Sequence, residues 1–285
     1  MDTAPVTPAS EFTEDLFSDD LLVTDDDLTA DDTDEAADGP DAAAAAATAP
    51  AAAPVGPEFV HLHLHSDYSM LDGACQISRL CERVKALGQK AVAVTDHGNM
   101  FGAMELYRTA TKQGLQPIIG CEFYTTPSGI ADRSDATRHH LVLLAKDFTG
   151  YQTLCHLNRI AWSDEGIYYK PRLDRDALRR HHEGLVCLTA CVAGEIPDCI
   201  LHGREDKARE ALEFFIEIFG KDDVYLELQY HAPPTLSMAE IADPEHRQLL
   251  AFERQVNQAL KRLAREYGVG LVATNDAHYL QPGDD

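Results

Sequence analysis

Length, composition and charge set the first limits on this chain. Its 285 residues are 45% hydrophobic and carry 24 Lys and Arg against 48 Asp and Glu, which gives a formal net charge of −24. That apolar share is enough for a sizeable core. No apolar run approaches the roughly 18 residues that a transmembrane helix needs, and the start of the chain lacks the basic residues of a secretion signal. We therefore expect a cytoplasmic protein with no membrane partner.

The first 57 residues differ from the rest in composition. They hold fifteen acidic residues and no Lys or Arg, and an acidic stretch, TDDDLTADDTDEAADGPD, leads into an Ala- and Pro-rich tract. This segment has too little apolar surface to offset the entropy lost on ordering. We therefore predict a disordered tail over 1–57 and one folded domain over 58–285. The segment EDLFSDDLLV could form a short partner-docking helix, although a solvated spacer is favoured. The folded part, with 24 basic against 33 acidic residues, lacks the positive charge to hold a nucleic acid backbone unaided.

From Glu58 onward, short β-branched or leucine-rich runs alternate with longer helical stretches, as in βα units. Helical spacing is clearest in 77–87 before Gly88, in 206–219 before Gly220 and in 249–263 before Gly268. The pattern predicts an α/β fold, a distorted seven-stranded TIM-like βα barrel, with a doubly wound open sheet as the alternative. The predicted strands are 59–64, 90–95, 116–121, 140–145, 184–189, 224–229 and 270–274.

Side chains able to bind metals gather at the ends of these strands. In HLHLHSDYSMLDG, the alternation of a strand places His61, His63 and His65 on one side. The loops of a βα barrel converge at the C-terminal face, so ligand-type residues after strand upon strand indicate a single site. His140 begins its strand where the others end theirs, which requires a shifted boundary or a strand of opposite direction. The other candidates are Asp72, Asp96, His97, Glu122, His139, Cys191, Asp276 and His278.

The donor types narrow the choice of metal. Imidazoles, carboxylates and one thiol suit Zn²⁺, Mn²⁺ or Fe²⁺ better than Ca²⁺, which prefers oxygen alone. Nine or more candidate ligands exceed what one tetrahedral ion can use, so we expect two or three divalent ions. Such clusters activate water and clamp the oxygens of a phosphoryl group, which favours phosphoester hydrolysis.

Seven blocks of the chain resemble, in order, the polymerase and histidinol phosphatase (PHP) domain that begins the alpha subunit of bacterial DNA polymerase III. They are FVHLHLHSDYSMLDGA, AVTDHGNMFGAMELY, PIIGCEFY, LVLLAKDFTGYQTLCHLNRIAW, YYKPRLD, GLVCLTACVAGEIP and ATNDAHYL. The resemblance runs from about Glu58 to the last residue, implies a distorted seven-stranded βα barrel, and does not extend to the first 57 residues. Carried over by motif, the ligand set would be His63, His65, Asp72, His97, Glu122, His140, Cys191, Asp276 and His278.

The remaining polar candidates receive other roles. By resemblance His61 is not a ligand and lies deeper in the barrel, and Asp96 orients a neighbouring imidazole. His231 is taken as structural or facing the substrate. Cys187 and Cys199 lie in or beyond apolar runs and are expected to be core thiols, and Lys170 and Arg172 of YYKPRLD are the best candidates for phosphate contact, or else solvent-facing charges.

The resemblance implies an enzyme of the DNA-directed DNA polymerase family whose nucleotidyltransferase parts lie beyond these residues. We expect this piece to act as a 3′→5′ exonuclease or a pyrophosphatase-like phosphoesterase, with the DNA 3′ end reached through the rest of the polymerase and other replicase subunits as partners. One alternative is a separate phosphatase of a small monoester such as histidinol phosphate. The other is a metal-bound scaffold without catalysis.

Overall fold

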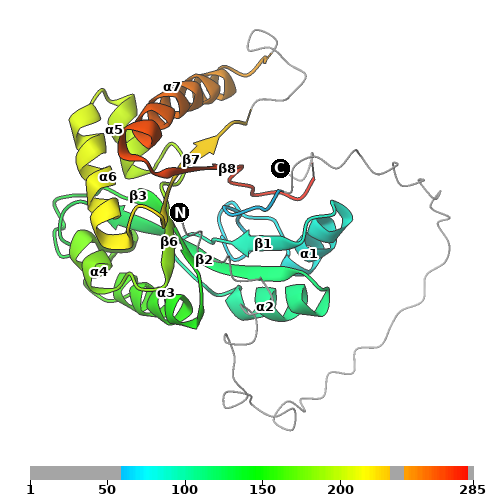
Figure 1. Cartoon of the computed structure of the whole chain (residues 1–285). Helices are drawn as coiled ribbons and strands as arrows, with labels where there is room; N and C mark the ends of the chain where they lie inside the picture. Colours follow the sequence, from blue (N-terminus) through cyan, green and yellow to red (C-terminus); the bar gives the residue numbers. More distant parts are fainter. Residues whose placement is uncertain (1–58, 232–240, 282–285) are drawn as a thin grey trace, which may run out of the picture.

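The computed structural model describes residues 59–231 and 241–281, and the tail predicted over 1–57 lies outside them. Helices and strands alternate along the described chain, and Figure 1 shows the strands as a curled sheet with helices around it. The helices are α1 (Ile77–Ala86), α2 (Ala103–Lys112), α3 (Phe148–Ala161), α4 (Arg175–Arg180), α5 (Glu195–Leu201), α6 (Glu205–Phe219) and α7 (Pro244–Tyr267). The strands are β1 (Ala91–Val94), β2 (Gln116–Thr126), β3 (His139–Ala145), β4 (Ile167–Tyr168), β5 (Lys170–Asp174), β6 (Leu185–Leu188), β7 (Val224–Gln229) and β8 (Gly270–Thr274).

Strand β2 is the centre of the sheet. It pairs in parallel with β1 near its start and with β5 near its end, and its other edge pairs with β3. Strand β3 runs antiparallel to both β2 and β6, whereas β6, β7 and β8 are parallel to one another. The reversed direction of β3 explains why His140 lies at the start of its strand and still reaches the same end of the sheet as Glu122.

The sheet is closed by single bridges rather than by a regular ladder. The segment 61–66 bridges to β1 through His61 and Val92, and to the residues after β8 through Leu64 and Ala277. The predicted strand 59–64 is therefore wrong as a continuous strand, because its backbone forms only these isolated pairs. Counted with this segment, the ring has seven members, of which the six strands were predicted from the sequence: 61–66, β1, β2, β3, β6, β7 and β8.

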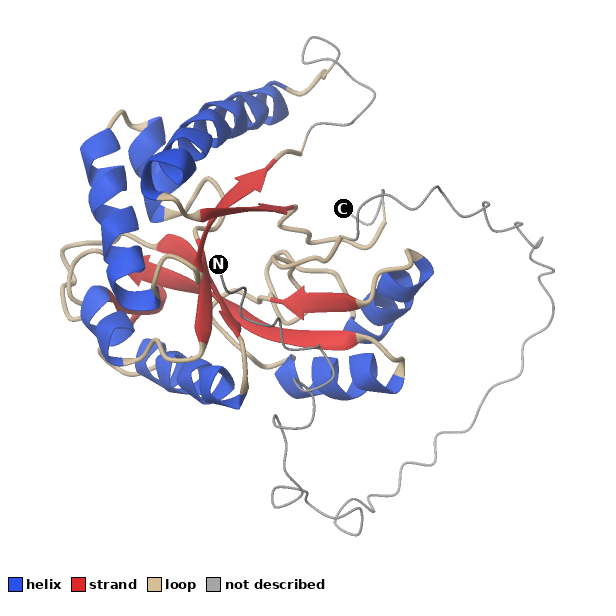
Figure 2. Ribbon diagram, viewed as in Figure 1, coloured by secondary structure: helices blue, strands red, loops and turns tan. Residues whose placement is uncertain are grey.

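Two apolar clusters hold the ring and its helices together. The larger one joins the outer faces of the strands to the helices. The smaller one, Ala93, Val142, Leu144, Leu188 and Ala190, comes from the strands and the residues that follow them. Val142 stands opposite Glu122 in the β2–β3 register, so this cluster occupies the face of the sheet that carries Glu122. Figure 2 shows the helices wrapped around the outside of the sheet, so the other face is left to form the interior.

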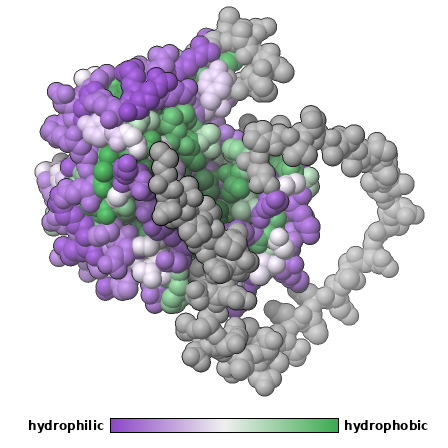
Figure 3. Space-filling view, in the orientation of Figure 1, coloured by the Kyte–Doolittle hydropathy of each residue, from purple (hydrophilic) through white to green (hydrophobic). Residues whose placement is uncertain are grey.

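The helix ends follow local sequence rules. Asp243 accepts hydrogen bonds from the backbone amides of Glu245 and His246 at the start of α7, and Pro244 occupies the first turn. Gly268 ends this helix in the left-handed conformation, with φ of 69°. In Figure 3, hydrophilic residues cover the helices on the left of the view, and hydrophobic ones gather over the sheet in the middle. None of the described helices combines the length and apolar character that crossing a membrane requires.

Candidate metal centre

Glu122 of β2 is the centre of a group of imidazoles. Its Oε1 lies 2.8 Å from His140 Nδ1 and 3.1 Å from His63 Nε2. Its Oε2 lies 2.6 Å from His97 Nδ1 and 3.6 Å from His65 Nε2. One buried carboxylate thus faces four histidines from three different segments, and its two oxygens are directed to two separate pairs of them.

Asp276, which follows β8, adds a second carboxylate to this group. Its Oδ1 lies 3.1 Å from both His63 Nε2 and His65 Nε2. Asp276 adopts a φ of 46°, a left-handed conformation that aspartate tolerates better than most residues. This turn directs the carboxylate inward immediately after β8.

The other predicted ligands lie at the edge of the same group. Asp72 Oδ2 is 3.3 Å from His97 Nε2, and Cys191 Sγ is 3.6 Å from His140 Nδ1. The His278 ring stacks on His65 with centroids 4.3 Å apart. The structure therefore brings all nine residues together from segments that lie far apart in the sequence. Three subsets have ligand atoms within 4.8 Å of one another: His65, His97 and His278; His63, His65 and Glu122; and His97, Glu122 and His140.

Several of the polar atoms at this centre are buried and lack a hydrogen bond. They belong to three residue types that bind metals, His, Glu and Asp, and the atoms themselves are inaccessible to solvent. Burying a polar atom without a partner costs on the order of 1–3 kcal/mol, so such a group indicates a missing ligand. The atoms are His63 Nε2, His65 Nε2, His97 Nδ1, Glu122 Oε2 and Asp276 Oδ1.

Glu227 is a supporting residue that the sequence analysis did not identify. It lies on β7, is 2% exposed, and its Oε1 accepts a hydrogen bond 2.7 Å from His63 Nδ1. With the proton held on Nδ1, Nε2 of His63 presents a lone pair to the centre. Gln229 Nε2 and Thr274 Oγ1 donate to the same carboxylate oxygen. In the sequence, the only indication of this role was an acidic residue inside the otherwise apolar strand VYLELQ.

Asp96, for which a supporting role is predicted, reaches His65 through Ser69. Its Oδ1 accepts from Ser69 Oγ at 2.8 Å and from the Ser66 amide at 2.8 Å. Because the Ser69 proton is used on Asp96, Ser69 Oγ accepts from His65 Nδ1 at 3.0 Å. This relay leaves Nε2 of His65 unprotonated and turned toward Glu122 and Asp276.

Burial and charge act in opposite directions on these groups. Burial lowers the pKa of His63. The charges of Asp276, Glu227 and Glu122 raise it by more than burial lowers it, so the pKa lies well above the ordinary value. Burial raises the pKa of Glu122. His140 and His63 lower it by more than burial raises it, so the pKa of this carboxyl lies well below its usual value. Burial raises the pKa of the Cys191 thiol well above its ordinary value. Without metal, protons on the histidines offset the negative charge of the carboxylates. Bound metal cations would take over this role.

The donor set fits divalent metal ions. Imidazole nitrogens, carboxylate oxygens and one thiol in a buried group match borderline cations, and the unpartnered atoms are the ones that ions would coordinate. The supporting bonds from Glu227 and Asp96 are of the kind that fix metal-binding imidazoles in protein sites.

Other candidates lie away from this centre. His231 donates to Glu253 and to the Asn275 carbonyl, so its role is structural. His61 packs edge-on against Phe59, with centroids 4.9 Å apart, and makes none of the contacts of the centre. Cys187 and Cys199 are buried core thiols, as expected.

The prediction of a phosphate contact is wrong for Arg172. Its side chain is fully buried, and its guanidinium donates to the carbonyls of Ile130, Asp132 and Asp135. Arg172 lies on β5 and therefore holds the 130–137 loop by these hydrogen bonds. Lys170 keeps its ammonium near the surface, 5.5 Å from the centre of the Tyr124 ring.

A family model described as PHP domain matches residues 61–231. The chain belongs to the PHP domain family. It is 43% identical over 230 residues to DNA polymerase III subunit alpha of Treponema pallidum, and 44% identical over 234 residues to that of Thermus aquaticus. The alignments cover 79% and 80% of this PHP domain chain, but only 18% of each relative. The chain therefore spans about a fifth of the length of these relatives.

A solved structure with a similar arrangement is a two-domain protein from Bacteroides vulgatus that contains a predicted PHP-like metal-dependent phosphoesterase. Its TM-score is 0.43 at 14% identity, and the match covers 77% of this chain and 51% of that one.

Proposed function

We propose that this PHP domain holds two or three divalent ions, Zn²⁺, Mn²⁺ or Fe²⁺, and hydrolyses phosphoesters at the 3′ end of DNA as the N-terminal part of a bacterial replicative polymerase alpha subunit. The nine residues His63, His65, Asp72, His97, Glu122, His140, Cys191, Asp276 and His278 would hold the ions. Family membership and the identity to polymerase III alpha subunits support the context. DNA and other replicase subunits are the proposed partners, in the cytoplasm.

The observation that carries the proposal is the convergence of five buried ligand atoms that face one another at 2.6–3.6 Å without forming a hydrogen bond. A stable core does not normally gather so many polar atoms that lack a hydrogen bond in one place. The atoms also differ in type, with three imidazole nitrogens and two carboxylate oxygens, which suits cation binding better than the binding of an anion.

The residues have separable tasks in this chemistry. When bound, divalent ions would supply Lewis-acid activation of water and neutralise the charge of a phosphoryl group. Glu227 holds the proton of His63 on Nδ1, and Ser69 with Asp96 holds that of His65 on Nδ1. Asp72, about half exposed at the mouth, is the carboxylate that an entering substrate would meet first. Glu122 is 1% exposed and would hold ions beside the imidazoles that it faces.

Two measurements on the whole chain test the proposal. Elemental analysis of protein purified without chelator should find two or three ions per chain. The protein loaded with Mn²⁺ or Zn²⁺ should release nucleotides from a 3′-terminated DNA strand in preference to phosphate from histidinol phosphate. Exclusive hydrolysis of the small ester would favour the separate phosphatase, and loading without turnover on either substrate would favour the scaffold.

Asp276→Asn is the decisive variant. It keeps the shape of the side chain but removes the charge that faces His63 and His65, so hydrolysis should fall by more than about 100-fold, since even residues that only support metal ligands cost 10–100-fold. The metal-free variant should keep most of its stability in urea unfolding. Asp164→Asn makes the same change at an exposed carboxylate and should leave turnover unaltered. Full turnover in Asp276→Asn would overturn the assignment.

A further inference from the structure

The hairpin formed by β4 and β5 presents the largely exposed ring of Tyr169, whose centroid lies 4.7 Å from that of the Tyr168 ring. Tyr168 pairs with Lys170 across the hairpin, which leaves Tyr169 alone at its tip. Tyr169 adopts a φ of 62°, which is unfavourable for a bulky side chain, and is 76% exposed. A strained, exposed ring at a tight turn is unusual unless the ring has a use outside the fold.

The neighbouring Tyr168 shows the contrast. Guanidinium groups cover its ring from Arg172 at 4.9 Å and from Arg133 at 5.2 Å. Arg133 also donates to the carbonyls of Asp164 and Ile167 and so holds the hairpin in place. Tyr168 and these arginines are therefore structural, and they hold Tyr169 in its exposed position.

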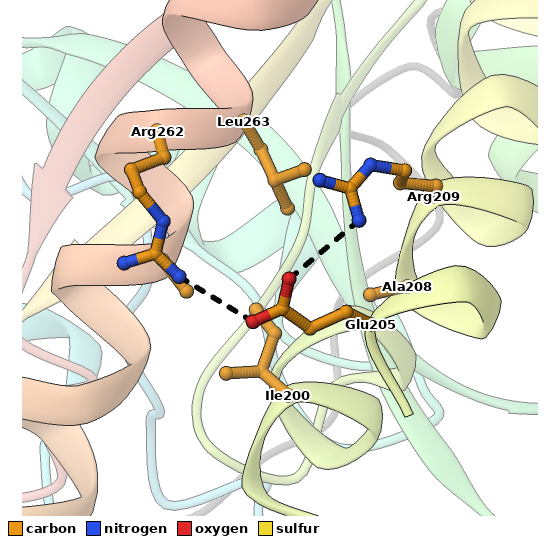
Figure 4. Close-up of a pocket in the computed structure, with 7 residues that line it drawn as sticks. Ile200, Glu205, Ala208, Arg209, Arg262 and Leu263 are labelled. Carbon is orange, nitrogen blue, oxygen red and sulfur yellow. Dashed lines mark hydrogen bonds and ion pairs between the residues drawn. The ribbon is translucent and has the colours of Figure 1, made fainter. Parts of the chain in front are cut away.

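Two cations beside the tip lie over aromatic rings and not beside carboxylates. The Arg138 guanidinium lies 5.7 Å from the Tyr169 ring centre, and the Lys170 ammonium lies 5.5 Å from that of Tyr124. Neither makes an ion pair or hydrogen bond with another residue of the described chain. In the pocket between α5, α6 and α7, by contrast, Arg209 and Arg262 both pair with Glu205, as Figure 4 shows. Unneutralised cations on a chain of net charge −24 point to an anionic ligand.

The hairpin adjoins the metal centre. The Tyr124 ring beneath Lys170 lies 5.9 Å from the His97 ring and 5.2 Å from the His140 ring, measured between centroids. Only the width of one tyrosine therefore separates Lys170 from two of the proposed ligands. A strand whose terminal phosphoester entered the centre would pass its next phosphates over this hairpin.

We propose that Tyr169, Lys170 and Arg138 form a ledge that binds single-stranded DNA: an unpaired base stacks on Tyr169 while the two cations hold the adjoining phosphates. The ledge rests on the proposed function and narrows its substrate to a frayed or single-stranded 3′ end. A ring face accepts any unstacked base, and two cations next to it neutralise the backbone, which is how sequence-tolerant single-strand sites are built. A duplex end keeps its bases stacked and offers none to Tyr169.

Binding in the absence of metal isolates the ledge from catalysis. The full chain in chelator is titrated against a fluorescent oligothymidine of about ten nucleotides, by anisotropy at about 50 mM salt. Tyr169→Asn tolerates the left-handed backbone but lacks an aromatic face, and should weaken binding roughly tenfold, within the stacking range of about 1–3 kcal/mol per base. Tyr169→Trp should restore it. Lys170→Gln and Arg138→Gln should each lower the slope of log affinity against log salt by about 0.7.

Matched controls separate the ledge from general effects. Tyr230→Asn removes another half-exposed tyrosine, and Arg262→Gln removes an arginine that is already paired. Both should bind within about twofold of the parent. No binding by the parent, unchanged binding by Tyr169→Asn, or an equal loss in Arg262→Gln would overturn the ledge. Hydrolysis of bis(p-nitrophenyl) phosphate by the Mn²⁺-loaded parent tests the proposed function on its own, so either idea can fail while the other stands.

Discussion

Individual carboxylates at the centre differ in how visible they are in the sequence. Glu122 directly follows the predicted strand 116–121, which marked it as a candidate, although strand β2 continues past it to Thr126. Glu227 lies within VYLELQ, where its neighbours suggest an ordinary buried strand. Its side chain is nevertheless as enclosed as that of Glu122, and it is tolerated there because His63, Gln229 and Thr274 all donate to it. Two of these donors, His63 and Thr274, lie 164 and 47 residues away, and such distant partners cannot be read from local sequence.

His231 provides a test of charge at one residue. Its two ring nitrogens face Glu253 and the Asn275 carbonyl, both acceptors, so the doubly protonated ring is favoured. The hydrogen bond to Glu253 raises the pKa of His231 above its ordinary value, although burial opposes it. A raised folded pKa stabilises the fold fully below the unfolded pKa of about 6.5, and this contribution is lost as the pH rises through the folded pKa.

His231→Gln should therefore lose more unfolding free energy at about pH 6 than at about pH 9, as measured by urea titration at each pH. The Glu253→Gln background serves as the control, because without the carboxylate the difference between the two pH values should shrink. Equal losses at both pH values in the parent background would contradict the ion pair.

Among the elements, the hairpin of β4 and β5 was not predicted. Strand β4 has only two residues, and the tyrosines and proline of YYKPRLD show no alternation that separates two strands. The reversed strand β3 was left open between two explanations, and the antiparallel register with β2 supports the second. Strand direction depends on which partner a segment meets, and the sequence of β3 alone carries no record of it.

Arg172 on β5 tests how one element holds another. Arg172→Met keeps the apolar stem but leaves the carbonyls of Ile130, Asp132 and Asp135 without their shared donor. Because hydrogen bonds to a buried charged group are worth about 1.5–3 kcal/mol, the variant should lose roughly 3 kcal/mol in urea unfolding, and limited proteolysis should cut faster within 130–137. Arg138→Met, at an exposed arginine without such bonds, should change stability by less than about 0.5 kcal/mol. Similar losses in both would contradict this role.

For the molecule as a whole, the weakest part of the ring is its closure. The segment 61–66 is joined to its neighbours by isolated bridges, one of which is the His65 amide donating to the Ala277 carbonyl at 2.8 Å. The ligands His63, His65 and Asp276 lie at this junction. Ions bound there would therefore also join the first and last segments of the described fold.

Metal addition should raise the melting temperature accordingly. At 100-fold excess over the dissociation constant, binding to the folded state adds about 2.7 kcal/mol, which corresponds to roughly 5–10 °C for a chain of this size. Mn²⁺ or Zn²⁺ titrated into chelator-stripped protein and followed by calorimetry checks the shift, and hydrogen exchange at the His65 amide should slow in parallel. Asp276→Asn should reduce both effects. A shift of the same size in that variant would place the ions elsewhere.

Local patterns in the chain were sufficient for much of this account. Periodicity and glycine ends predicted the main helices and six of the seven ring members, because amphipathic spacing and capping depend on near neighbours. The pattern also showed a larger set of candidate ligands, because His, Asp, Glu and Cys stand out at the ends of apolar runs, and the family resemblance narrowed that set to nine.

Long-range contacts decided the rest. Glu122 faces four imidazoles, Glu227 fixes His63, Arg172 turns inward to a loop some 40 residues away, and 61–66 closes the ring by bridges instead of a ladder. Each of these depends on which distant segment a side chain or amide meets. Burial and pairing arise only when the chain is folded, so no neighbouring residues record them in advance.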